Sequence, residues 1–218
     1  MSSPSRLHRL VLAAAVTFAG GLAHAAPTYT PDDFFHAIEV DDARGVTKMV
    51  GLGLDPNLRD AKGQAALFVA LRGESMKAAK ALMDAPGIQL DAKNGADETP
   101  LMMAALRGKV DAATELVAHG AAVNKDGWTP LHYAATSGNV AVIKLLLAHG
   151  AVLEARSPNR TTPLMMAARY GSEEAVDALL AAGADRTLTN DQGMDSVAFA
   201  QTSGRDFLVK KLKTPAAH

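Results

Sequence analysis

The pattern of apolar and polar positions is clearest in the middle of the chain, where it predicts two short helices joined by a tight turn. Thr129 has the character of a helix N-cap, and Pro130 follows at the first helical position, where its missing N–H costs nothing. Gly138 is typical of a residue that ends a helix. Beyond it, Val142 and Leu146 belong to the apolar stripe of a second helix. We therefore expect a helix–turn–helix unit here.

This unit is one of several copies. The heptapeptide Thr129–Ala135 has counterparts at Thr99–Ala105, 30 residues earlier, and at Thr162–Ala168, 33 residues later. Recurrence at this interval indicates stacked units, because a single helix pair cannot bury its apolar face alone. Residues Thr129–Ala134 read T-P-L-H-x-A, so the chain resembles the ankyrin-repeat family. The resemblance implies that His132 takes part in hydrogen bonding between repeats.

The resemblance also implies an all-α fold, an ankyrin-repeat solenoid of about six helix–turn–helix units, two of them caps, linked by hairpin-like loops. One repeat has Ala65-Ala66 in place of Thr-Pro, and the lost capping hydroxyl is expected to cost that helix about 1 kcal/mol. In the last unit we expect Arg205, Lys210 and Lys211 to face water. The expected repeats cover residues 34–62, 63–96, 97–126, 127–159, 160–192 and 193–212, between a lead-in over 26–33 and a tail over 213–218.

The first 25 residues have the features of a secretory signal peptide. Arg6 and Arg9 provide a positive segment, an apolar stretch follows, and Ala23-His24-Ala25 provides the A-x-A pattern of a cleavage site. The alternative is an uncleaved membrane anchor, but the stretch is shorter than the roughly 18 to 20 apolar residues that cross a bilayer. We expect cleavage after Ala25 and no membrane insertion of the mature chain.

Cysteine content and charge narrow the compartment and the partner. The sequence contains no cysteine, so an oxidising compartment has no thiol to couple. Export without disulfides favours a bacterial periplasm over a eukaryotic extracellular space. Removing Arg6 and Arg9 changes the formal charge from −1 to −3, whereas nucleic-acid binders are usually strongly basic. We therefore expect a periplasmic protein that does not bind nucleic acid.

One loop between repeats is shorter than the others. Gly120 to Gly127 spans seven steps along the chain, whereas Gly53 to Gly63 and Gly183 to Gly193 each span ten. The hairpin-like loop, or finger, that enters the repeat of Trp128 should therefore be stunted. Two interpretations stay open: the short finger leaves Trp128 accessible, or the indole packs against the neighbouring repeat.

No catalytic motif is present in the sequence, which lacks G-x-S-x-G, a Gly-rich phosphate loop, H-E-x-x-H and any cysteine nucleophile. His119 and His149 take the same place in successive repeats, which should leave them about 10 Å apart, too far to share a zinc ion. Met102 and Met165 carry thioethers of the kind that bind Cu(I), but their place on first helices favours packing. We expect no cofactor and no enzymatic activity; the alternative is a metal-binding protein or an enzyme that uses His or Met clusters.

In ankyrin proteins the finger tips and the two residues after A-A line a concave face, which is the surface that varies between members. Nine basic residues fall at such positions here, against five acidic ones: Arg59, Lys62, Arg72, Lys93, Arg107, Lys125, Arg156, Arg160 and Arg169, against Asp60, Asp97, Glu98, Asp126 and Glu154. These charges either merely keep the surface soluble or form a polarised face that meets an acidic partner. Trp, Tyr and Arg are enriched at interface hot spots. The candidate binding residues are therefore Arg72, Arg107, Trp128, Tyr133, Arg156, Arg160, Arg169 and Tyr170.

The sequence thus favours a monomeric, non-enzymatic scaffold that recognises another periplasmic protein through its concave face. Two versions stay open at this point. One is an immunity or inhibitor protein that neutralises an exported toxin or enzyme. The other is an accessory factor that stabilises a periplasmic enzyme.

Overall fold

The computed structural model describes residues 29–214, in which twelve α-helices form six antiparallel pairs, with one isolated β-bridge between Arg59 and Ala65. The helices are α1 (Pro31–Glu39), α2 (Ala43–Gly51), α3 (Ala66–Arg72), α4 (Met76–Met83), α5 (Pro100–Leu106), α6 (Val110–Ala118), α7 (Pro130–Ser137), α8 (Val140–Ala148), α9 (Pro163–Tyr170), α10 (Glu173–Ala181), α11 (Ser196–Thr202) and α12 (Asp206–Lys213). The expected all-α solenoid of six helix pairs is confirmed. The expected signal peptide lies outside the described residues.

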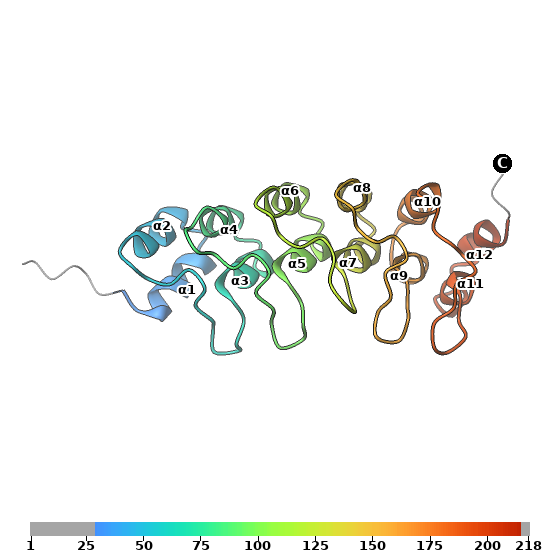
Figure 1. Cartoon of the computed structure of the whole chain (residues 1–218), viewed down its shortest axis with the longest axis horizontal. Helices are drawn as coiled ribbons and strands as arrows, with labels where there is room; N and C mark the ends of the chain where they lie inside the picture. The colour runs from blue at the N-terminus through green and yellow to red at the C-terminus, as the bar shows by residue number, and fades with distance from the viewer. Residues whose placement is uncertain (1–28, 215–218) are drawn as a thin grey trace, which may run out of the picture.

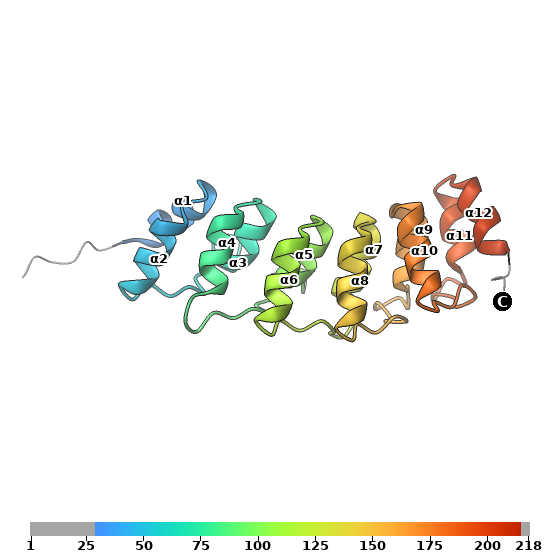
Figure 2. The same ribbon diagram turned by 90° about the horizontal axis from the view of Figure 1, so that it is seen from above.

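The six pairs stand side by side in chain order. The second helix of each pair belongs to one row and the first helix to another, and long loops project from the first helices as fingers (Figure 1). Seen from above, the pairs follow one another along a single axis (Figure 2). The side formed by the first helices and the fingers is called the concave face below.

Local capping chemistry sets where the first helices begin. Thr99, Thr129 and Thr162 are N-caps in extended backbone, each followed by proline at the first helical position. The residue three places on closes the cap from the other side. His132 Nδ1 accepts the N–H of Thr129 at 3.2 Å, and the equivalent methionine sulfur accepts the threonine N–H at 3.4 Å in the other two repeats. Imidazole and thioether therefore do the same capping work here.

Two helix starts in the N-terminal half add to this pattern. Helix α1 begins at Pro31, three residues before the expected start of the first repeat, because Thr30 and Asp33 form a capping box in which the Thr30 N–H donates to the Asp33 carboxylate at 2.9 Å. Helix α3 has Ala65 at its N-cap, which makes no side-chain hydrogen bond. The missing cap at Ala65 is the one expected from the sequence.

A close backbone approach between two repeats explains two of the glycines. Gly138 ends α7 with φ +73°, and a Cβ atom there would lie 2.5 Å from the backbone nitrogen of Ser172. A Cβ atom at Gly171 would lie 2.3 Å from the carbonyl oxygen of Ala135. A side chain at either position would push these two repeats apart.

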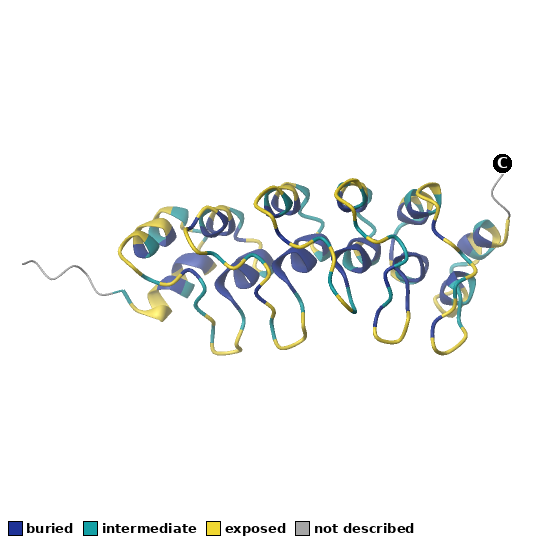
Figure 3. Ribbon diagram, in the orientation of Figure 1, coloured by how far each residue is buried: buried dark blue, intermediate teal, exposed yellow. Residues whose placement is uncertain are grey.

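The core runs continuously through the stack between the two rows of helices, and the finger tips are exposed (Figure 3). Leu116, Leu131, Ile143 and Leu146 are each fully buried in it. Lys144, between two of them in sequence, is exposed. This alternation is the helical pattern expected of a second helix that buries one stripe.

The last unit differs from expectation at two of its three basic residues. Nη1 of Arg205 donates to the carbonyl oxygens of Ala167 and Ala168 at 3.1 and 3.2 Å, so it caps the end of α9 instead of facing water. Lys211 forms ion pairs with Glu173 at 2.6 Å and Asp177 at 2.7 Å. Lys210 is exposed, as expected. These side chains attach the C-terminal cap to the preceding repeat.

Within residues 29–214, no helix has the length and apolar character needed to cross a membrane.

Candidate functional site

Two rows of equivalent residues run along the concave face. The residue seven places after each helix cap is Arg72, Leu106, Thr136 or Arg169 in four successive repeats, and we call this set the R-L-T-R row. The residue four places after the cap forms a second row, which contains Val69, Met103, Tyr133, Met166 and Phe199. Both rows lie on the first helices. The R-L-T-R row is basic at its two ends and uncharged in the middle.

A hollow of about 210 Å³ lies at the middle of these rows and is called the Trp128 pocket below. It is lined by Leu106, Trp128, His132, Tyr133, Thr136 and Met166, from three successive repeats. The lining is mostly aromatic and aliphatic. The pocket is smaller than small-molecule sites, which typically have volumes of about 300 to 1,000 Å³.

Hydrogen bonds and ring contacts hold the aromatic walls of this pocket in place. Trp128 is half-buried, and its ring meets that of His132 edge-on with 5.1 Å between the centroids. The hydroxyl of Tyr133 donates to Glu98 Oε1 at 2.8 Å. Burial, with the hydrogen bond to the Glu98 carboxylate, raises the pKa of Tyr133. Trp128 thus lines a cavity and packs against His132 of its own repeat.

His132 lies behind Trp128 and joins two repeats. One ring nitrogen takes part in the cap of α7, and the other, Nε2, donates to the carbonyl oxygen of Thr161 at 2.9 Å. The side chain is fully buried. Burial lowers the pKa of His132 to about 4, because the bond to Thr161 does not compensate for the lost water. His132 is therefore a neutral connector in the fold.

The finger beside Trp128 reaches less far than its neighbours (Figure 1). Lys125, in this finger, forms an ion pair with Asp97 of the preceding finger and donates to the carbonyl oxygen of Trp128 at 3.2 Å. Hydrogen bonds from Lys125 and Lys93 lower the pKa of Asp97 to about 2. Lys125 and Lys93 are thus paired within the fold, and their charges are not free to meet a partner.

Three of the candidate arginines are engaged or displaced from the pocket. Arg156 Nη1 donates to the carbonyl oxygens of Arg160 and Thr189, at 2.9 and 3.0 Å, and thereby joins two fingers. Arg160 is at an exposed finger tip with φ +60°. Arg107 lies 4.0 Å from the carboxylate of Glu74, in the turn before α4. Arg156 is consequently a structural residue of the fingers.

The two arginines of the R-L-T-R row, Arg72 and Arg169, have neighbours of a different kind from those of the three arginines above. Arg72 donates to the side-chain oxygen of Gln64. The guanidinium of Arg169 lies 5.1 Å from the ring centroid of Tyr170 and 6.0 Å from that of Phe199. Within residues 29–214, neither Arg72 nor Arg169 forms an ion pair. Tyr170 is 55% exposed.

The histidines and methionines considered for metal binding are occupied in other ways. Nδ1 of His119 donates to the carbonyl oxygen of Glu115 at 2.8 Å, and Nδ1 of His149 makes the equivalent bond within its own helix at 2.9 Å. The sulfurs of Met102 and Met165 close helix caps. In the part of the chain that the structure describes, no three His, Cys, Asp or Glu side chains come together in a way that could hold a metal ion.

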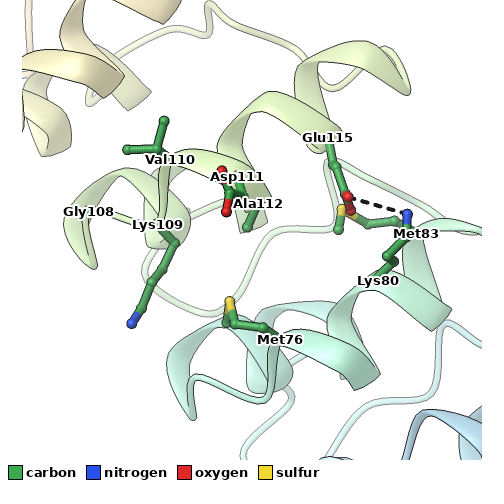
Figure 4. Close-up of a pocket in the computed structure, with 9 residues that line it drawn as sticks. All are labelled: Met76, Lys80, Met83, Gly108, Lys109, Val110, Asp111, Ala112 and Glu115. Atoms are coloured by element: carbon green, nitrogen blue, oxygen red, sulfur yellow. Dashed lines mark ion pairs between the residues drawn. The ribbon is translucent and has the colours of Figure 1, made fainter.

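A second hollow, which sequence reasoning missed, lies on the side of the second helices. It has a volume of about 440 Å³ and separates α4 from α6. Met76 points across it toward α6, and an ion pair of 3.3 Å between Lys80 and Glu115 lies at one end (Figure 4). The separation of two helices leaves no signal in the periodicity of either one.

Comparison with known proteins agrees with this architecture. The family profile described as ankyrin repeats (3 copies) matches residues 34–124 and 86–157, and the profile of a single ankyrin repeat matches residues 159–191. The chain therefore belongs to the ankyrin-repeat family, whose members are typically protein-binding scaffolds. Among proteins of curated function, none matches this chain significantly in sequence.

Two solved structures are similar over most of the chain. One is a chain in the complex of the Bd0816 predatory endopeptidase from Bdellovibrio bacteriovorus with the immunity protein Bd3460, with 28% identity, a TM-score of 0.72, and coverage of 84% of this chain and 98% of that chain. The other is the ankyrin repeat protein EF0377, with 22% identity, a TM-score of 0.73, and coverage of 85% and 98%. The second similarity concerns the fold alone.

Proposed function

We propose that this protein is a non-enzymatic, monomeric scaffold of the bacterial periplasm that binds another protein through its concave face. The observation that carries the proposal is the Trp128 pocket, an uncharged hollow in the middle of a face whose outer positions are basic. A partner with an acidic surface and one protruding apolar side chain fits this arrangement. Of the candidate residues, Arg72, Trp128, Tyr133, Arg169 and Tyr170 are best placed to touch it.

We further propose that the partner is an exported enzyme which this protein inhibits, as an immunity protein does. Support comes from the similarity to a chain in a complex between an endopeptidase and an immunity protein. The similar region covers 84% of this chain and 98% of that chain. The signal-peptide pattern before Ala26 also supports this assignment, because it implies export into a compartment where hydrolases act.

The experiment is affinity capture from a periplasmic extract of the native host, with the mature chain from Ala26 as bait. We expect one exported enzyme to be recovered, and the purified pair to be less active than the enzyme alone. An enzyme whose activity or lifetime rises on binding would instead make this protein an accessory factor. Recovery of nothing from an extract in which the protein is natively abundant would contradict the scaffold proposal.

A further inference from the structure

The charge and shape of the R-L-T-R row define the segment that fits it. Its middle residues, Leu106 and Thr136, line the Trp128 pocket. Among the described residues, its end residues, Arg72 and Arg169, form no ion pair with a carboxylate. Glu98, the carboxylate bonded to the Tyr133 wall of the pocket, has both oxygens engaged: it accepts from Tyr133 at 2.8 Å and from Asn94 at 2.8 Å.

The spacing of the row sets the length of that segment. Packed helices lie about 10 Å apart, so three repeat steps separate Arg72 from Arg169 by about 30 Å. An extended chain rises by about 3.3 Å per residue, so about nine residues cover this distance. The pocket lies between the second and third positions of the row, near the centre of such a segment.

We propose, resting on the function proposed above, that the partner contributes an extended acidic segment which lies along the R-L-T-R row. Its two acidic ends meet Arg72 and Arg169, and one apolar side chain at its centre enters the Trp128 pocket. Carboxylates favour guanidinium groups because the two groups can pair through two parallel hydrogen bonds. The central side chain enters the hollow that Trp128 and Leu106 line, next to the stunted finger.

Occupation of the Trp128 pocket can be followed by intrinsic fluorescence, because Trp128 is the only tryptophan in the sequence. The probe is a synthetic peptide of nine residues, with aspartate at both ends, phenylalanine at the centre and glycine and serine elsewhere, titrated into the mature protein. We expect a saturable change in Trp128 emission that weakens as salt is raised. Replacing the phenylalanine by serine, or both aspartates by lysine, should weaken binding by about tenfold or more.

Matched protein variants distinguish the effect of the two arginines at the ends of the R-L-T-R row from the effect of the protein's overall charge. Arg72→Glu and Arg169→Glu should each weaken peptide binding by about fivefold or more, whereas Arg44→Glu, at an exposed position on α2, should change it by less than about twofold. Thr136→Phe should block the pocket. This position tolerates bulk, because its equivalents in neighbouring repeats are leucine and arginine.

Equal responses to the acidic and the basic peptide, or no response up to about 1 mM, would overturn the inference. So would an Arg72→Glu variant that binds like the parent protein. These outcomes leave the proposed function to its own test: a captured enzyme that the peptide does not displace would keep the scaffold proposal and refute only the acidic segment.

Discussion

The substitution His132→Met tests how one buried side chain joins two repeats. Methionine occupies the equivalent position in the repeats on either side, where its sulfur accepts the N–H of the capping threonine. The variant should therefore keep the cap of α7. It removes the hydrogen bond from Nε2 to the carbonyl oxygen of Thr161, the edge-on ring contact with Trp128 and the ability to titrate.

Two effects of opposite sign determine how much His132→Met changes the free energy of unfolding. Near neutral pH the variant leaves the buried carbonyl of Thr161 without its donor, which should lower the free energy of unfolding by about 1 to 3 kcal/mol. In acid the wild-type protein has its own penalty, because the pKa of His132 falls from 6.5 in the unfolded chain to about 4 in the folded one. A difference of one pKa unit between the two states corresponds to about 1.4 kcal/mol, so protonation of the unfolded chain lowers the unfolding free energy of the wild-type protein by about 3 kcal/mol near pH 4.

The sign follows from which state holds the proton. Above pH 6.5 both states of His132 are neutral and its full contribution to stability is present. As the pH falls from 6.5 toward 4, His132 is protonated in the unfolded chain but stays neutral in the folded chain. Its contribution to the free energy of unfolding is therefore lost over this range. The methionine variant has no such loss at this position.

The assay is urea unfolding of both proteins at several pH values between about 7.5 and 4, with the difference in unfolding free energy taken at each pH. Other titrating groups are common to both proteins and cancel in the difference. We expect the advantage of the wild-type protein to shrink by about 3 kcal/mol across this window and to vanish or reverse near its lower end. A difference that stays constant with pH would show that His132 titrates alike in both states, and the reasoning from its burial would fail.

Further expectations concern stability, processing and the pocket. Leu146→Ala should lower the unfolding free energy by about 2 to 5 kcal/mol because a fully buried leucine is lost, whereas Lys144→Ala should stay within about 0.5 kcal/mol; similar losses in urea would mean that the faces of α8 are misassigned. Protein recovered from the native host should begin at Ala26, which intact-mass measurement checks; a chain that retains Met1 would refute signal cleavage. Trp128→Ala should weaken binding of the captured partner by about 2 kcal/mol or more while the far-UV circular dichroism stays unchanged, and unaltered affinity would remove the indole from the binding face.

The sequence by itself determined the features of this protein that depend on short stretches of chain. Thr-Pro at the helix starts and glycine at their ends are local signals, because a cap or a left-handed residue acts within one turn of helix. Their recurrence was enough to count the repeats, and the difference in loop length was enough to locate the short finger next to Trp128. The missing cap at Ala65 was also evident without coordinates. The early start of α1 was missed, although Thr30 and Asp33 carry a capping-box pattern of their own.

Only the tertiary structure decided which side chains of the concave face are free. The sequence assigns both Arg156 and Arg169 to the concave face. In the structure Arg156 donates to a carbonyl oxygen in the next finger, 33 residues away, whereas the guanidinium of Arg169 lies near two aromatic rings. The pocket at Trp128 and the hollow between α4 and α6 likewise arise from side chains of separate repeats. Periodicity specifies which face of a helix a residue occupies, but the reach of a long side chain and the gap between two helices depend on what the neighbouring repeat places opposite them.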